Sequence, residues 1–144
     1  MALLHTLTIA LHVLFAAAWF GMALALPALG RAALAGSAPG SEKLLTAMNG
    51  SAVLFYVFAF SNWVLGMQIG FELQYNAWPY HTSMTLGLTL VGVQLFLIRP
   101  SWKKLVSGGG EPAKKRLAMG VGIGHTVWLL LFVLMYLGRG VVGA

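Results

Sequence analysis

The sequence contains no cysteine and few charged residues. Of its 144 residues, 8% are charged, 3 are acidic and 59% are hydrophobic. Without cysteine the chain can form no disulfide bond, no thiolate metal site and no thiol redox centre. Soluble domains carry about a quarter of their residues as charges, so this composition predicts a membrane protein.

The scarcity of acidic side chains restricts the chemistry further. The three acids are Glu42, Glu72 and Glu111, and all fall outside the interiors of the apolar runs. We therefore expect neither a paired-carboxylate mechanism nor a carboxylate proton relay within the membrane.

Four apolar runs are each long enough to cross a hydrocarbon core, which takes about 20 helical residues. They cover residues 4–26, 48–70, 79–98 and 117–138. The sequence therefore predicts an all-α fold, an integral membrane four-helix bundle that forms one domain over residues 1–144. The first run has no basic segment before it and is too long for the apolar part of a signal peptide, so we expect a membrane helix there.

Lysine and arginine are concentrated in the connections after the first and third runs. These connections hold eight of the nine basic residues, namely Arg31, Lys43, Arg99, Lys103, Lys104, Lys114, Lys115 and Arg116. Arg139 alone lies on the other side. The positive-inside rule then predicts basic loops in the cytoplasm and both termini outside, and we expect a multi-pass protein of the bacterial inner membrane.

The net charge of +6 follows from this topology and suits a surface of anionic lipid. We therefore expect the lipid bilayer, and no nucleic acid, as a partner. The glycine-rich centre of the second basic connection, residues 107–112, is predicted to be a flexible hinge.

Histidine is the ionisable residue that remains within the apolar runs. All four histidines, His5, His12, His81 and His125, fall inside predicted helices. With a rise of about 1.5 Å per residue, His12 lies about 12 Å and His125 about 20 Å from the outer face, while His5 and His81 lie in first turns. The heptad spacing of His5 and His12 puts them on one face of the first helix.

Uncharged polar residues accompany the histidines at matching depth. Asn62 is predicted near the level of His12, and Gln94 near that of His125. Polar groups within a membrane face the bundle interior or one another. A ligating histidine usually gives its second ring nitrogen to an acceptor, so Asn62 joins the four histidines as a candidate cofactor-binding residue.

An all-imidazole donor set favours haem b or copper over metals that prefer oxygen ligands. His12 is the first candidate ligand. Two pairs could ligate a metal together: His5 with His81 near the outer face, and His12 with His125 at greater depth.

Glycines 66, 70, 120, 122 and 124 predict close helix contacts, either within the chain or in a homo-oligomer.

Residues 11–21, Leu-His-Val-Leu-Phe-Ala-Ala-Ala-Trp-Phe-Gly, followed by Pro27 and Arg31, resemble the first helix of a superfamily of small membrane proteins. This superfamily includes the HemJ-type protoporphyrinogen oxidases and the CopD-type copper-resistance proteins. A second, weaker likeness is the segment 78–82, Trp-Pro-Tyr-His-Thr, which resembles the Trp-x-His-x-Lys entry of the third HemJ helix with the histidine displaced by one position.

The resemblance implies a haem b or copper site that uses His12. Two departures argue against the porphyrinogen-oxidising activity itself. Thr82 and Ser83 stand where the family has its lysine, and residues 30–32 read Gly-Arg-Ala where it has a Tyr-His pair.

Together these features predict a haem b-binding membrane cytochrome that transfers electrons to or from quinone or a partner redox subunit. Two alternatives stay open. In the first, the chain is a non-redox accessory subunit of a larger membrane complex, and its polar residues only join helices. In the second, it transports or delivers copper in the CopD manner through His5, His12 and His81, with Met67 and Met84 as the best-placed methionines.

Overall fold

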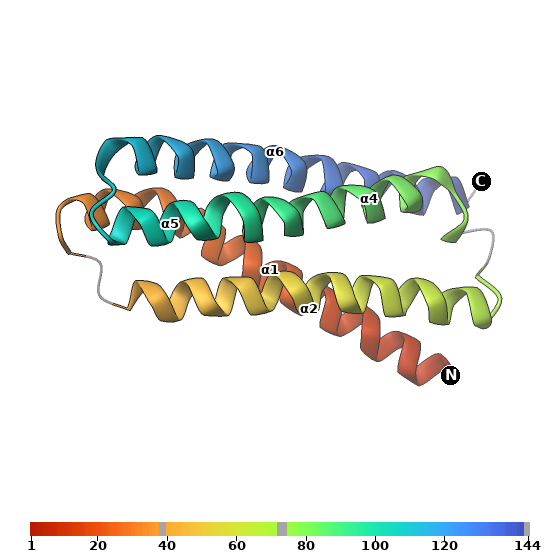
Figure 1. Cartoon of the computed structure of the whole chain (residues 1–144). Coiled ribbons are helices and arrows are strands. Elements are labelled where there is room, and N and C mark those ends of the chain that lie inside the picture. Colours follow the sequence, from red (N-terminus) through yellow and green to blue (C-terminus); the bar gives the residue numbers. More distant parts are fainter. Residues whose placement is uncertain (38–39, 72–74, 143–144) are drawn as a thin grey trace.

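The computed structural model describes residues 1–37, 40–71 and 75–142, and in the last range the side chains as far as residue 137. Glu72 and the side chain of Arg139 therefore lie outside the described residues. The described chain is all-α (Figure 1). Its elements are α1 (Ala2–Leu34), α2 (Ser41–Gln68), α4 (Trp78–Gly92), the π-helix η1 (Val93–Ile98), α5 (Arg99–Val106) and α6 (Gly110–Val142).

Four helical segments are long and apolar enough to cross a membrane, as the sequence predicted. Because α4, η1 and α5 continue one another, the four segments are Ala2–Leu34, Ser41–Gln68, Trp78–Val106 and Gly110–Leu137. Within the most apolar window of each, 22–39% of the residues are buried inside the protein. The remaining apolar side chains are therefore available to lipid.

The basic connection after the third segment is shorter than predicted. Residues 99–106 form α5 and α6 starts at Gly110, so the predicted flexible hinge is reduced to the turn at residues 107–109. Lysine and arginine are good helix formers, and Lys103 and Lys104 stand in the last turn of α5, where positive charge is favourable. Trp102 and Leu105 are buried, which gives α5 a packed face.

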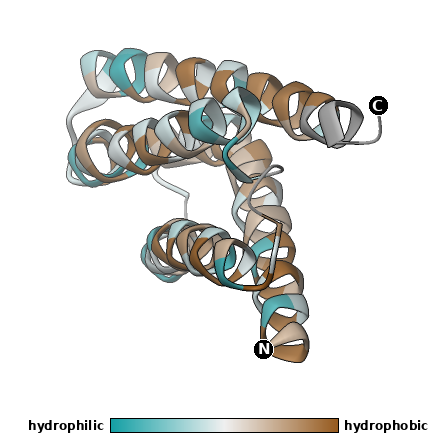
Figure 2. Ribbon diagram, turned by 90° about the vertical axis from the view of Figure 1, so that its right-hand side faces the viewer, coloured by the Kyte–Doolittle hydropathy of each residue, from teal (hydrophilic) through white to brown (hydrophobic). Residues whose placement is uncertain are grey.

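The helices are arranged as two packed groups. α1 packs along α2, while α4, η1 and α5 pack along α6. α1 also contacts α5 and α6 and so joins the groups. It crosses the other helices obliquely (Figure 1), and in the end-on view it extends from the α4 and α6 level down past α2 (Figure 2).

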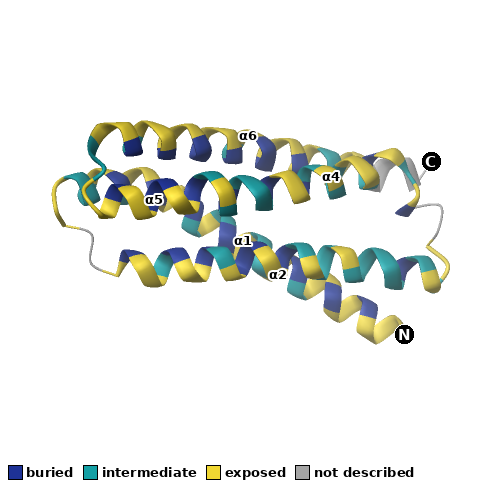
Figure 3. Ribbon diagram, in the orientation of Figure 1, coloured by how far each residue is buried: buried dark blue, intermediate teal, exposed yellow. Residues whose placement is uncertain are grey.

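The buried side of α1 follows the helical repeat. Its members are His5, Thr8, His12, Trp19, Ala23, Leu26 and Gly30. Successive spacings of three, four or seven residues place them along one stripe. His5 and His12 therefore share a face, as predicted. Buried residues of the other helices likewise lie on the sides that face their neighbours (Figure 3).

Three aromatic rings from different helices form the centre of the core. The ring centroids of Trp19 and Trp128 are 5.2 Å apart, those of Phe55 and Trp128 5.3 Å, and those of Trp19 and Phe55 5.6 Å. All three side chains are at most 2% exposed. Such contacts among large rings join α1, α2 and α6 at one level.

One of the predicted small-residue surfaces is used within the chain. A Cβ atom built on Gly120 would lie 3.1 Å from side-chain atoms of Leu97 and Ile98. The missing side chain therefore lets α6 approach η1 closely. Gly122 has nothing within 4 Å of such an atom.

A polar chain joins α1, η1 and α2 beside the aromatic core. The Trp19 indole Nε1 donates to Gln94 Oε1 at 3.2 Å, and Gln94 Nε2 donates to Asn49 Oδ1 at 3.0 Å. Gln94 is 0% exposed. It lies in the π-helix η1, a local widening that often accompanies functional or strained positions.

Replacing Gln94 by leucine should destabilise the fold. The Gln94→Leu change removes two interhelical hydrogen bonds and leaves the donor of Trp19 without its acceptor, so we expect a loss of about 1–3 kcal/mol. Denaturant titration of the protein in mild detergent measures this loss. The control is Thr89→Val, because the exposed Thr89 hydroxyl bonds only to its own helix, at Thr85 O. Equal stability of the two variants would contradict a structural role for the hydrogen bonds that Gln94 makes with Trp19 and Asn49.

Candidate functional site

A small cavity lies between α1, α2, α4 and α6 in the half of the molecule that contains the α2–α4 connection. Its volume is about 70 Å³. His12 lines it from α1, Asn62 and Trp63 from α2, and Met84 from α4. His12 and Asn62 line one cavity, but His12 contacts Phe55, which lies about two helical turns before Asn62 on α2. Asn62 is joined through Tyr75 to His5 instead, so the predicted match in depth between Asn62 and His12 is wrong.

His12 is held in a defined orientation. Its Nδ1 lies 3.1 Å from the carbonyl oxygen of Phe55, and the imidazole stacks on the Phe55 ring with centroids 4.7 Å apart. A carbonyl oxygen can only accept, so Nδ1 carries the hydrogen and Nε2 of the neutral ring has its lone pair free. Within the described part of the chain, Nε2 makes no hydrogen bond.

Asn62 is connected to His5 through Tyr75. The Tyr75 hydroxyl donates to Asn62 Oδ1 at 3.3 Å, and His5 Nε2 lies 3.0 Å from the same hydroxyl oxygen. Because the tyrosine hydrogen is committed to Asn62, His5 Nε2–H is the donor to Tyr75. Burial raises the pKa of Tyr75 above its ordinary value, with a smaller contribution from neighbouring Tyr80, so the hydroxyl keeps its proton well above neutral pH.

Tyr75 is a site residue that sequence reasoning missed. It is 5% exposed, and Trp63 Nε1 donates to its backbone oxygen at 3.3 Å. Its ring lies directly against Gly66: a Cβ atom built there would approach Tyr75 Cδ2 to 2.6 Å. The glycine pattern predicts a close contact at Gly66, but it does not show which side chain occupies the space.

The other two histidines lie elsewhere. His81 is exposed, whereas the buried residues of α4 are Pro79, Gly87 and Leu90. His125 lines a separate cavity of about 10 Å³ together with Trp19 and Gln94. Its level therefore matches that of Gln94, as predicted.

The structure does not bring the two predicted histidine pairs together: His12 and His125 line different cavities, and neither His5 nor His81 lines either of these two. His5 packs against Phe71 and Tyr75, with ring centroids 5.7 and 5.9 Å away. The Nε2 atom of His125 is buried, and it has no hydrogen-bond partner within the described residues. Over those same residues, no cluster of three or more histidine, cysteine or acidic side chains could hold a metal ion.

Methionine adds soft donors to the His12 cavity. Met84, a sequence-based candidate, lines it together with Met135 of α6, whereas Met67 does not. Met135 was not singled out from the sequence because its position on the last helix shows nothing of its orientation. Thioether sulfur and neutral imidazole are ligands for haem iron and for copper, so the cavity has the donors for one redox-active metal.

The Gly66–Tyr75 contact gives a direct test of this site's construction. Gly66→Ala should force the tyrosine ring away and weaken its bonds to His5 and Asn62, at a cost of about 1–3 kcal/mol typical of overpacking. Thermal unfolding in detergent measures the effect. Gly50→Ala is the matched control on the same helix, because a Cβ atom there has no neighbour within 4 Å and alanine favours helix by up to about 1 kcal/mol. A Gly66→Ala protein as stable as the control would refute the contact.

Comparisons of the chain with protein-family models, with curated proteins and with solved structures find no match.

Proposed function

We propose that this chain holds a redox-active metal within the membrane through His12 and transfers electrons there. The observation that carries the proposal is the hydrogen bond from His12 Nδ1 to the carbonyl oxygen of Phe55. Histidines that bind metals commonly donate their second ring nitrogen to such an acceptor, which orients the ring and raises its basicity. His12 has this arrangement, and its Nε2 is left for a ligand.

The first form of the proposal is haem b. Aromatic side chains that suit a flat macrocycle line the cavity, namely Phe55, Tyr56, Trp63, Tyr75 and Tyr80. His12 would hold the iron, and Met84 or Met135 would supply the other protein ligand. Haem supplies a reversible one-electron iron couple, and a methionine ligand raises its potential. Quinone or a partner membrane subunit would exchange the electrons.

The volume of the cavity sets a condition on haem binding. About 70 Å³ is below the roughly 300 Å³ of the smallest usual ligand pockets. Phe55 and Tyr56 pack at 3.5 and 3.6 Å from a Cβ atom built on Gly87, and so they close the space between α2 and α4. The cavity as it stands is therefore too small for haem, and haem binding at His12 would require side chains around it, Phe55 and Tyr56 among them, to move.

The second form is a single copper ion, and two observations favour it. A cavity of about 70 Å³ has room for a single ion, and Met84 and Met135 line it together with His12. Thioether and imidazole donors select Cu(I) among biological metals. In this form the chain would carry or deliver copper within the membrane instead of transferring electrons.

The proposed setting is the bacterial inner membrane, with both termini outside. Eight of the nine basic residues belong to the α1–α2 and α5–α6 ends of the helices, which supports a cytoplasmic position for that end.

A reduced-minus-oxidised absorption spectrum of the protein purified in mild detergent tests the haem form. We expect the sharp bands of a b-type cytochrome in the native protein and in His81→Ala, because His81 is exposed. His12→Ala should lose most of the pigment, and added imidazole should restore part of it, since the free ligand can occupy the vacated position. Size-exclusion elution checks that the variant is folded.

A full haem complement in His12→Ala would refute the ligand assignment. A colourless native protein that copurifies with a stable partner would favour the accessory-subunit alternative over the haem form.

Titration with Cu(I) against a competing chelator tests the copper form. His12→Ala should abolish binding, and Met84→Leu and Met135→Leu should each weaken it by about tenfold, or about 1.4 kcal/mol, because each removes one thioether donor. Met67→Leu is the control, because Met67 does not line the cavity. Equal affinity in Met84→Leu and Met67→Leu would exclude Met84 as a ligand.

A further inference from the structure

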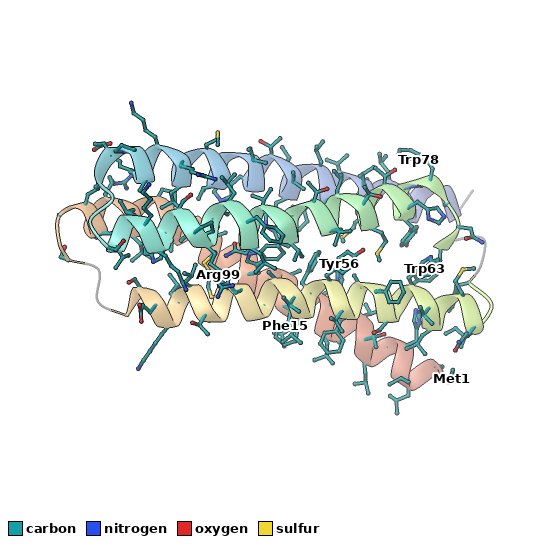
Figure 4. The ribbon with its side chains drawn as sticks, viewed as in Figure 1. Met1, Phe15, Tyr56, Trp63, Trp78 and Arg99 are labelled. Carbon is teal, nitrogen blue, oxygen red and sulfur yellow. The ribbon has the colours of Figure 1, made fainter. Side chains whose placement is uncertain are left out.

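A second and larger cleft lies at the opposite end of the molecule from the His12 cavity. It has a volume of about 690 Å³ and is bounded by the first turns of α2 and by α5. On the α2 side its walls include Leu45 and Asn49, and on the α5 side Arg99 and Trp102. Figure 4 shows the Arg99 side chain in the space between α5 and α2.

The cleft is rich in unpaired positive charge. Arg99, Lys103 and Lys104 line it, and among the described residues none of these side chains makes an ion pair or a hydrogen bond. The only acidic residue of the lining is Glu42, on the first turn of α2. The cleft therefore keeps an excess of positive charge that an anion would neutralise.

A buried donor without a partner lies in the same wall. Trp102 is 1% exposed, and its indole Nε1 has no hydrogen-bond partner within the described residues. Buried indole N–H groups nearly always find an acceptor. The indole N–H of Trp102, a residue that lines the cleft, is therefore a donor that no described residue uses.

The position of the cleft indicates which anion this is. The segment Trp78–Val106 is one of the four candidate membrane spans, and its sequence changes from apolar to basic at Arg99. The cleft thus lies where the apolar part of the helix ends, at the depth of lipid headgroups. Basic pockets between membrane helices at this level suit phosphate headgroups.

We propose that the cleft between α2 and α5 binds the phosphate of an anionic phospholipid headgroup. Arg99, Lys103 and Lys104 neutralise the phosphate, and the indole N–H of Trp102 supplies a hydrogen bond. The acyl chains extend along the apolar surface toward the middle of the membrane. This site is separate from the His12 cavity and does not depend on a metal there.

Native mass spectrometry of the full chain in detergent tests this proposal. The probes are phosphatidylglycerol, phosphatidylcholine with the same acyl chains, and inorganic phosphate. We expect one tightly held phosphatidylglycerol and much weaker binding of phosphatidylcholine. The double variant Arg99→Gln/Lys103→Gln should bind phosphatidylglycerol about thirtyfold more weakly, because each basic side chain near an anionic lipid contributes roughly fivefold.

The matched control is Lys43→Gln/Lys115→Gln. It removes the same charge from the same end of the molecule, and neither residue lines the cleft. Its affinity should stay within about twofold of the native value, because charges outside the cleft act only through a screened field. A second variant, Trp102→Phe, keeps a similar ring but lacks the N–H, and should weaken binding by about tenfold, as loss of a hydrogen bond to a charged group does.

Three outcomes would overturn the proposal. Equal losses in the two double variants would mean that the basic end attracts lipid without a specific site. Phosphatidylcholine held as tightly as phosphatidylglycerol would exclude recognition of the anionic headgroup. Inorganic phosphate that displaces the lipid at comparable concentration would make the ligand a free anion instead. Size-exclusion elution like that of the native protein confirms that each variant is folded.

Discussion

A polar side chain within the membrane must find its hydrogen-bond partner inside the protein, because lipid offers none. Gln94 meets this constraint most fully, since it is 0% exposed and bonds to both Trp19 and Asn49. Its two bonds tie η1 to α1 and to α2, and so connect the two packed groups of helices. The aromatic core lies beside these hydrogen-bonded side chains and is positioned by the same helices.

The four histidines differ in how they meet this need for a hydrogen-bond partner. His12 gives Nδ1 to a backbone carbonyl, and His5 bonds to Tyr75. His81 is exposed in the first turn of α4, at the end of its helix, and His125 keeps a buried Nε2 that is unpaired within the described chain. Only His12 combines a fixed ring with a cavity that also contains thioether and amide side chains. For this reason the metal proposal rests on one histidine and not on a pair.

Part of the candidate site was predictable, and the rest was not. Depth along a helix follows from the rise per residue, so the shared level of His125 with Gln94 could be predicted. The level of His12 was placed at Asn62 but lies at Phe55, about two turns away on α2, because a count along the chain does not fix how one helix is offset along another. Depth does not specify rotation about the helix axis, and therefore it could not show that His81 is exposed. Tyr75 and Met135 reach the His12 cavity from distant parts of the chain, and no local pattern marks them. The helix at residues 99–106 was missed because its basic residues were interpreted as a loop.

The sequence by itself determined the all-α class, the four segments able to cross a membrane and the shared face of His5 and His12. Each of these depends on a local quantity, namely the apolar length of a run or the helical repeat. The tertiary structure decided which faces meet: the oblique path of α1, the Gln94 bridge, the His12 cavity and the basic cleft. These depend on how each helix rotates and crosses its neighbours. The rotation and crossing of each helix are set by the packing of all the side chains together.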